Sequence, residues 1–174
     1  EVNKDKFHAN DDTLYQTMRF MTVDGETLTT TSIPKPLEQV LETEYPEVEH
    51  AELISWEEEF LLQIDDKFTR EKGHYVGDAF FEIFSYPLLA GDSKSVLQDK
   101  YSIVISEEVA IKYFGNDWAS NPEVIGASMK IENGDLHKIT GVFENTGSNS
   151  SLQFDIMLNI EVFIEDNEWV EHWG

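Results

Sequence analysis

The stretch YSIVISEEVAIKYFG, residues 101–115, has the pattern of a buried strand that runs directly into a helix. Residues 101–105 are almost continuously apolar, which is typical of a strand covered on both faces. Ser106 is placed to cap the helix, and the two Glu residues after it suit the positive end of the helix dipole. Gly115 is a natural C-terminal stop. The stretch therefore predicts a strand followed by a capped helix.

Two hairpins are predicted on either side of this unit. Residues 14–32 contain Asp24–Gly25, and residues 127–144 contain Asn133–Gly134. Such dipeptides between apolar runs are strong signals of a two-residue hairpin turn.

Further strands are expected in two other places. Residues 48–77 contain the short apolar runs HAELISW and EFLLQI, which predict two or three strands. Apolar and polar residues alternate from 152 to 160, which predicts a strand with one buried face. The acidic end, 165–174, is compatible with an amphipathic helix or a frayed terminus.

Short helices complete the pattern. A helix is expected from Pro36 to Tyr45, and Pro46 ends it. The run FFEIFSYPLLAGD, residues 80–92, predicts a short helix whose three Phe side chains share one buried face. The sequence therefore indicates an α+β fold, with two interleaved subdomains within residues 1–174 treated as one domain.

The composition restricts the classes of partner. The chain has 35 Asp and Glu residues against 12 Lys and Arg, for a net charge of −23, and it has no cysteine. Such a charge is repelled by nucleic-acid phosphates and by anionic lipids, so no nucleic-acid partner is expected. The absence of cysteine excludes disulfides and thiolate chemistry.

No catalytic motif is recognisable. The five His residues at 8, 50, 74, 137 and 172 form no metal-binding pair, and we expect no metal, cofactor or catalytic residue in this domain. Asp65–Asp66 and Glu57–Glu59 are the only candidates for a carboxylate pair, either as a weak calcium site or in an enzyme. Adjacent residues on a strand point to opposite faces, so solvated surface is the alternative interpretation of both runs.

Several segments, taken in order, resemble the periplasmic core domain of MacB/FtsX-like ABC-transporter permeases. These segments are DKFHANDDTLYQTMRF, PLEQVLETEYPEVE, VGDAFFEIFSYPLLAGD, YSIVISEEVAIKYFG, ITGVFE and NSSLQFDIML. The resemblance runs from about residue 5 to about residue 160. We expect the matching positions to be structural: Phe7, His8, Asn10, Tyr15, Pro46, Phe80, Phe81, Phe84, Gly91, Ser106, Phe114, Gly115, Gly126, Gly141, Ser151, Phe154 and Asp155.

The resemblance implies a fold, a place and a role. The fold has one α/β subdomain with βαβ-like units and one mostly β subdomain. The place is the periplasmic side of the bacterial inner membrane, with this chain as an excised soluble domain. The role is non-catalytic: the domain transmits conformational change that is driven by ATP and Mg on a cytoplasmic ATPase subunit. The implied partners are that subunit, a second permease copy and, in some relatives, a periplasmic adaptor.

The sequence departs from the family pattern in two ways. The ENTGSNSS loop lacks the family's usual Pro, and the family's region normally continues beyond the Trp-containing segment. The resemblance thus implies that a C-terminal part of the region is missing here. Two rival hypotheses remain: a secreted acidic module that binds calcium or a basic partner, and an enzyme with a carboxylate site.

Overall fold

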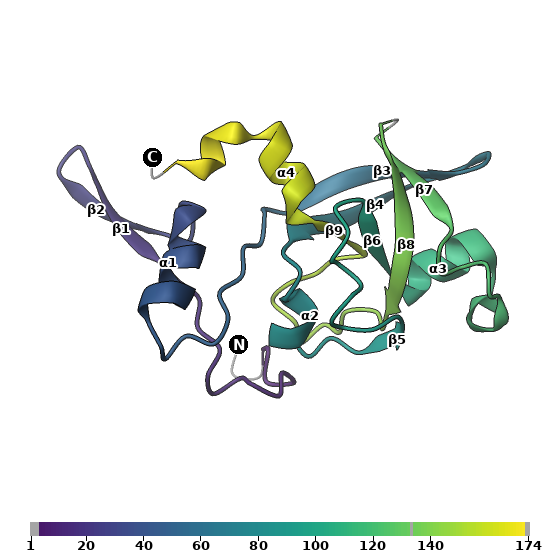
Figure 1. Ribbon diagram of the computed structural model, residues 1–174, viewed down its shortest axis with the longest axis horizontal. Coiled ribbons are helices and arrows are strands. Elements are labelled where there is room, and N and C mark those ends of the chain that lie inside the picture. Colours follow the sequence, from purple (N-terminus) through teal and green to yellow (C-terminus); the bar gives the residue numbers. More distant parts are fainter. Residues whose placement is uncertain (1–3, 133, 173–174) are drawn as a thin grey trace.

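A seven-stranded sheet organises the computed structural model, which describes residues 4–132 and 134–172 (Figure 1). Its strands are β3 (Glu58–Ile64), β4 (Lys67–Val76), β5 (Leu88–Ala90), β6 (Ser102–Ser106), β7 (Ser128–Ile131), β8 (Leu136–Phe143) and β9 (Ile156–Asn159). They lie in the order β5-β8-β6-β9-β4-β3-β7. Because β7 also pairs with β8, six strands close into a ring and β5 extends it.

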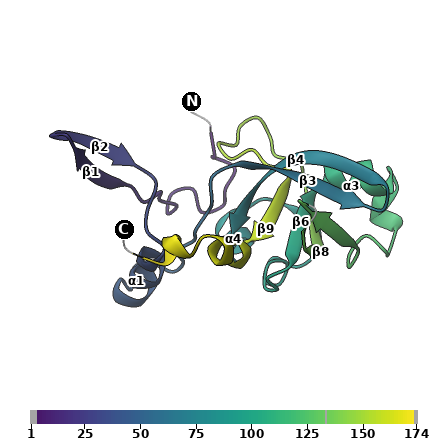
Figure 2. The ribbon, with the colours of Figure 1, turned by 90° about the horizontal axis from the view of Figure 1, so that it is seen from above.

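Short helices and a separate hairpin surround this sheet. The helices are α1 (Pro36–Glu44), α2 (Phe80–Ile83), α3 (Glu107–Phe114) and α4 (Ile160–Asp166), with 3-10 turns η1 (Trp118–Ser120) and η2 (Glu168–Glu171). The hairpin consists of β1 (Arg19–Val23) and β2 (Glu26–Thr30). Figures 1 and 2 show this hairpin projecting away from the sheet, with α1 beside its base.

The predicted strand–helix unit is confirmed as β6 and α3. All five residues of β6 are buried, and the Ser106 hydroxyl accepts a hydrogen bond from the Val109 N–H at 3.3 Å. Gly115 ends the helix with a φ of 90°, which a residue with a side chain rarely adopts. β6 runs parallel to β8, so β6, α3 and β8 form a βαβ-like crossover. This crossover and the mixed helix–sheet architecture agree with the predicted α+β class.

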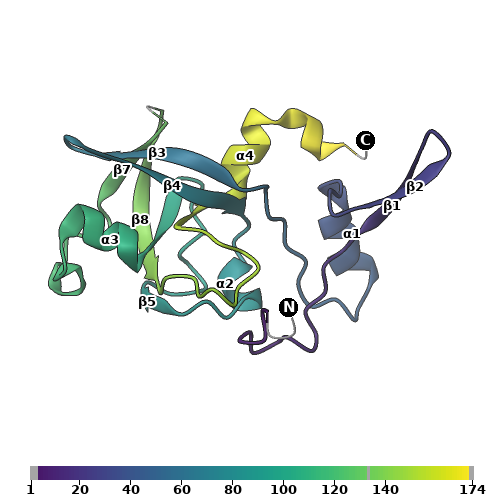
Figure 3. The ribbon, with the colours of Figure 1, turned by 180° about the vertical axis from the view of Figure 1, so that it is seen from behind.

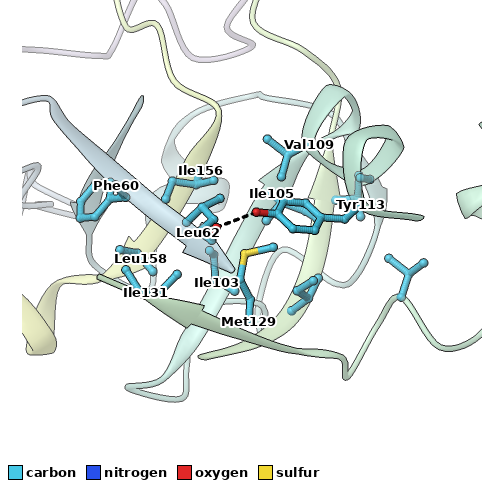
Figure 4. Packing of buried hydrophobic residues seen from close by; sticks show 14 of the residues in the cluster. Phe60, Leu62, Ile103, Ile105, Val109, Tyr113, Met129, Ile131, Ile156 and Leu158 are labelled. Carbon is cyan, nitrogen blue, oxygen red and sulfur yellow. Dashed lines mark hydrogen bonds between the residues drawn. The ribbon is translucent and has the colours of Figure 1, made fainter. Parts of the chain in front are cut away.

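One hydrophobic cluster fills the inside of the ring (Figure 4). Every second residue of a strand points to the same face. Ile103 and Ile105 of β6 therefore share this cluster with Ile156 and Leu158 of β9. Helix α3 packs onto it, and the Tyr113 hydroxyl donates a hydrogen bond to the Leu62 carbonyl at 2.9 Å.

A second cluster, which we call the aromatic knot, lies on the other face of the same strands. It is built around Phe80, Phe81, Tyr86, Phe143 and Phe154, and it also contains the alternate residues of the central strands. The short helix predicted in residues 80–92 is confirmed as α2, in which Phe80 and Phe81 are buried. The third Phe of the prediction, Phe84, follows the helix and is only partly buried.

The N-terminal segment packs on the aromatic knot. His8 is buried, and its ring lies 5.2 Å from that of Tyr86 and 5.4 Å from that of Phe84. The Ser85 N–H donates to His8 Nδ1 at 3.1 Å, while the Ala9 N–H donates to Ser85 Oγ at 2.9 Å. These two reciprocal bonds fix residues 8 and 9 to the loop that follows α2, before the chain continues to the hairpin.

Two strand predictions are wrong, for reasons of tertiary packing. The strand expected to be half-buried is β9, of which all four residues are buried because it lies between β6 and β4 with a cluster on each face. Its alternating pattern also stops early, since Ile160 begins α4. Residues 48–77 contain two strands, β3 and β4, as predicted, but the run HAELISW is not one of them. Only Ile54 of this run makes an isolated bridge, to Val76.

Both predicted hairpins are present. Asp24 and Gly25 have φ values of 51° and 84° and form the tight turn between β1 and β2. In the second hairpin, β7 pairs with β8, and residue 133 of the expected turn lies outside the described residues. The C-terminal segment 165–172 is helical in part, through α4 and η2. None of the helices described is long and apolar enough to cross a membrane.

Candidate functional site

An acidic cavity lies where α1 meets the sheet region. It has a volume of about 450 Å³ and is lined by residues of α1, the segment before β3, the start of α2 and the start of α4. Figures 1 and 3 show α1 on one side of this region, with α2 and α4 on the other. Its wall carries six carboxylates and two lysines: Glu38, Glu42, Glu52, Asp78, Glu82 and Glu161, with Lys35 and Lys94.

Glu52 is the most enclosed of these carboxylates. Its Oε1 accepts a hydrogen bond from the Leu53 N–H at 3.1 Å. The carboxylate lies directly against Gly77, where any Cβ would overlap it. A side chain at position 77 would therefore displace the Glu52 carboxylate from this place.

Burial and like charges act on Glu52 in the same direction. Burial is the larger cause, and the nearby carboxylates of Glu38 and Asp78 add to it, so that the pKa of Glu52 rises to about 8. Burial also raises the pKa of Glu38, an effect that Lys35 opposes. Glu52 therefore takes up a proton near neutral pH, when most carboxylates are ionised.

The arrangement can join α1 to the sheet region in a way that responds to charge. Glu42 of α1 accepts the Ala51 N–H at 2.9 Å, so carboxylates supply polar contacts between α1 and the segment before β3. None of the residues of α1 is buried, so the helix has little apolar contact to hold it. When Glu52 is ionised, its charge repels Glu38 of α1 and opposes the packing of this helix, and when Glu52 is protonated this repulsion is absent.

The structure brings many of the sequence-predicted positions together. Phe7, His8, Phe80, Phe81, Phe84 and Phe154 lie in or against the aromatic knot. The Asp155 carbonyl accepts the Ser106 N–H at 2.7 Å, and the Ser151 N–H donates to Asp5 Oδ1 at 2.8 Å.

The remaining predicted positions are spread over turns, strand β8, the end of α3 and the surface. Gly91 and Gly126 each have a φ of 97°, and a Cβ at Gly141 would meet Val96 Cγ1 at 2.9 Å. Phe114 and Gly115 end α3. Asn10, Tyr15 and Pro46 are exposed and do not join any cluster of these positions.

The two candidate carboxylate runs lie in different settings. Lys72 pairs with Glu57 at 2.7 Å, and Arg70 pairs with Glu59 at 3.4 Å. Asp65 and Asp66 form the turn between β3 and β4, with Asp65 at a φ of 51°. Within residues 4–132 and 134–172, no group of three or more His, Asp or Glu residues is placed to hold a metal ion.

The comparison with protein families settles the relationship that the motifs indicated. The family model described as the MacB-like periplasmic core domain matches residues 2–171. The chain belongs to this family. The chain is thus a MacB-like domain of the periplasmic type.

Solved structures share the fold of this MacB-like domain. A domain of a protein described as a permease from Porphyromonas gingivalis has 27% identity and a TM-score of 0.67, over 86% of this chain. The extracellular domain of the noncanonic ABC-type transporter YknZ from Gram-positive bacteria has 14% identity and a TM-score of 0.60, over 85% of this chain and 74% of its own. The periplasmic region of MacB from Actinobacillus actinomycetemcomitans has 13% identity and a TM-score of 0.57, over 79% of this chain and 59% of its own.

The MacB-like domain spans 61% of the length of the Porphyromonas gingivalis permease domain. A search of curated proteins gave no match. The family relationship therefore rests on the family model, and the solved structures show that the fold is shared.

Sequence reasoning missed the acidic cavity. None of its carboxylates was singled out in the sequence, because they come from four separate segments. One signal was present: Glu38 and Glu42 are four residues apart and therefore lie on one face of α1. Nothing in the sequence indicated that Glu52 would lie against Gly77.

Proposed function

We propose that this domain transmits ATP-driven conformational change from an ABC permease across the membrane, for export or other extracytoplasmic work. The observation that carries the proposal is the pair of hydrophobic clusters on opposite faces of the same central strands. Closely packed interiors carry strain instead of absorbing it. A ring filled on the inside and covered by the aromatic knot is suited to move as one body.

The partners follow from the same proposal. A cytoplasmic ATPase subunit supplies the energy with ATP and Mg, and the domain itself needs no cofactor. A second permease copy forms the dimer in which the domains approach and separate, and a periplasmic adaptor takes part where the transporter has one. Membership of a permease family supports each of these assignments.

In this proposal, the acidic cavity is the place where two parts of the domain move relative to one another. The sheet region and the part that contains the hairpin and α1 form the two subdomains in our proposal. The cavity contains polar, charged contacts, whereas the sheet region has a hydrophobic interior. A movement of one part relative to the other then breaks few buried apolar contacts.

We expect ATP to change the distance between the sheet regions of two permease copies. The chain has no cysteine, so Ile111→Cys on the exposed side of α3 gives one labelling site in this domain. Spin-label distances are measured in the complete permease with its ATPase, with ADP and with ATP. Identical distance distributions in the two states would contradict transmission.

A second pair of labels tests rigid-body movement. Ile111→Cys combined with Phe68→Cys places both labels on exposed positions of one sheet region. This internal distance is expected to stay the same in ADP and ATP. A change in it as large as the change between copies would show that the sheet region deforms.

We also propose that further permease polypeptide covers the β1–β2 hairpin. The hairpin exposes an unusual number of large apolar side chains, namely Phe20, Met21, Val23 and Leu28. The neighbour from Porphyromonas gingivalis is longer than the matched region.

Hydrogen exchange of the hairpin tests this covering. Amides of β1 and β2 are expected to exchange more slowly in the complete permease than in residues 1–174 alone, since packing suppresses local opening. Amides of β6, already in the core, serve as the internal control. Equal exchange of the hairpin in both samples would contradict the proposal.

A further inference from the structure

Two exposed Trp side chains form a surface feature that the proposed transmission does not use. Trp56, just before β3, is 57% exposed, and Trp169 of η2 is 62% exposed. Their rings are nearly parallel, with 6° between the planes and 6.5 Å between the centroids. We call Trp56 and Trp169 the tryptophan ledge.

Buried aromatic rings hold Trp56 in place. Its ring meets the edge of Phe163 at 5.0 Å, and Phe163 packs against Tyr75 at 5.6 Å. Tyr75 in turn meets Phe60 of the ring interior at 5.4 Å. Trp169 is oriented by a hydrogen bond from its Nε1 to Asn167 Oδ1 at 3.3 Å. The ledge is therefore exposed but ordered in advance, which lowers the entropy lost on binding.

The surroundings of the ledge are acidic. Burial raises the pKa of Tyr75 to about 12, and the nearby carboxylates of Glu58 and Asp166 add to this rise. Burial raises the pKa of Glu58, and a hydrogen bond with Trp56 opposes this rise. Among the residues that the structure describes, Glu58 and Asp166 form no ion pair.

Two lysines whose partners adjoin these carboxylates in the sequence are already engaged. Lys72 pairs with Glu57, and Lys100 pairs with Glu165. Lys100 also lies over the Tyr101 ring, and in the described part of the chain no Lys or Arg lies over either Trp of the ledge. Indole faces in a negative field without a cation of their own are suited to a cationic group from outside.

We propose that the tryptophan ledge is a docking surface for a basic segment of a partner protein. An Arg or Lys side chain of the partner stacks on an indole face while Glu58 and Asp166 attract its charge. Trp is favoured at the centre of protein interfaces, and the guanidinium of Arg stacks well on aromatic faces. Charge complementarity with a chain of net charge −23 selects a basic partner. The inference does not depend on the transport role.

A peptide titration tests the ledge. An Arg-Gly repeat peptide is titrated into the chain by calorimetry at low salt, with a Glu-Gly repeat peptide for comparison. We expect the Arg-Gly peptide to bind and the Glu-Gly peptide to give no heat. The Trp56→Ala, Trp169→Ala double variant is expected to bind the Arg-Gly peptide about tenfold more weakly, because the cation–π contact is lost.

Two controls separate the ledge from general attraction. Tyr15→Ala removes an aromatic side chain that is 85% exposed on a distant segment, and it should leave the affinity unchanged. Trp169→Ala alone, at an exposed position, keeps the test valid if loss of Trp56 disturbs Phe163. Equal affinity of the parent chain and the Trp variants would overturn the proposal. Binding of N-acetyl-arginine amide as tightly as the peptide would also overturn it, in favour of a small-cation site.

Discussion

Replacing Phe81 with alanine is expected to lower the free energy of unfolding by about 3 to 5 kcal/mol. Phe81 is 6% exposed and packs edge to face on Phe80, with 5.2 Å between the ring centroids, and against Phe143 at 6.3 Å. The loss has two parts: the favourable free energy of burying the ring, which the variant lacks, and the cost of the cavity that is left behind. Because the neighbouring rings belong to a buried cluster, the cavity cannot easily collapse.

Urea denaturation followed by circular dichroism measures this loss. Phe20→Ala is the matched control, since it removes the same side chain from a hairpin position that is 76% exposed. The control is expected to change stability by no more than about 0.5 kcal/mol. If Phe81→Ala costs no more than Phe20→Ala, the aromatic knot is not part of the core.

Glu52→Gln is expected to stabilise the domain at alkaline pH and to have little effect in acid. The pKa of Glu52 is raised from 4.5 to about 8 in the folded domain. A raised carboxyl pKa contributes stability that is complete below 4.5 and is lost as the pH rises toward 8. Glutamine stays neutral throughout and can still accept the Leu53 N–H, so the variant does not suffer this loss.

The expected size of the effect comes from the same shift. The change from 4.5 to about 8 corresponds to at most about 5 kcal/mol between acid and alkaline conditions. Movement of α1 away from the cavity relieves part of the repulsion, so the measured difference between variant and parent is expected to be smaller. Other groups titrate as well, so the difference between the two proteins is the quantity to compare.

Thermal or urea unfolding at pH 4.5 and at pH 8.5 measures this difference. Glu44→Gln provides the control, because it removes a charge from an exposed position of α1. The control is expected to stay within about 0.5 kcal/mol of the parent at both pH values. A Glu52→Gln stability gain that is the same at both pH values would contradict the assignment of the proton to Glu52.

The sequence correctly predicted features that depend only on residues close together in the chain, namely helix caps, helix ends and tight turns. The cap at Ser106, the stop at Gly115 and the turn at Asp24–Gly25 appear where the sequence places them. These features are set by backbone geometry and hydrogen bonds within a few residues, so a single segment carries enough information. The ordered motifs carried the family relationship, which the family model confirmed.

Tertiary structure decided how much of each element is buried. The alternation in residues 152–160 predicts one buried face, yet β9 is buried on both because it lies between β6 and β4. The position of a strand in a sheet depends on long-range pairing, which local alternation does not contain. In the hairpin within residues 14–32, burial is instead lower than an apolar sequence suggests, since its large apolar side chains are exposed in this chain.

The two candidate sites could not be predicted from the sequence. Glu38, Glu52 and Asp78 are dispersed along the chain, and only folding brings them within range of one another. The same holds for Trp56 and Trp169, because Trp56 precedes β3 and Trp169 lies in η2, near the C-terminus. By itself, the sequence determined the local elements, the acidic charge and the family. Only the tertiary structure decided the acidic cavity and the tryptophan ledge, because desolvation and Coulomb interactions depend on distance in space and not on separation along the chain.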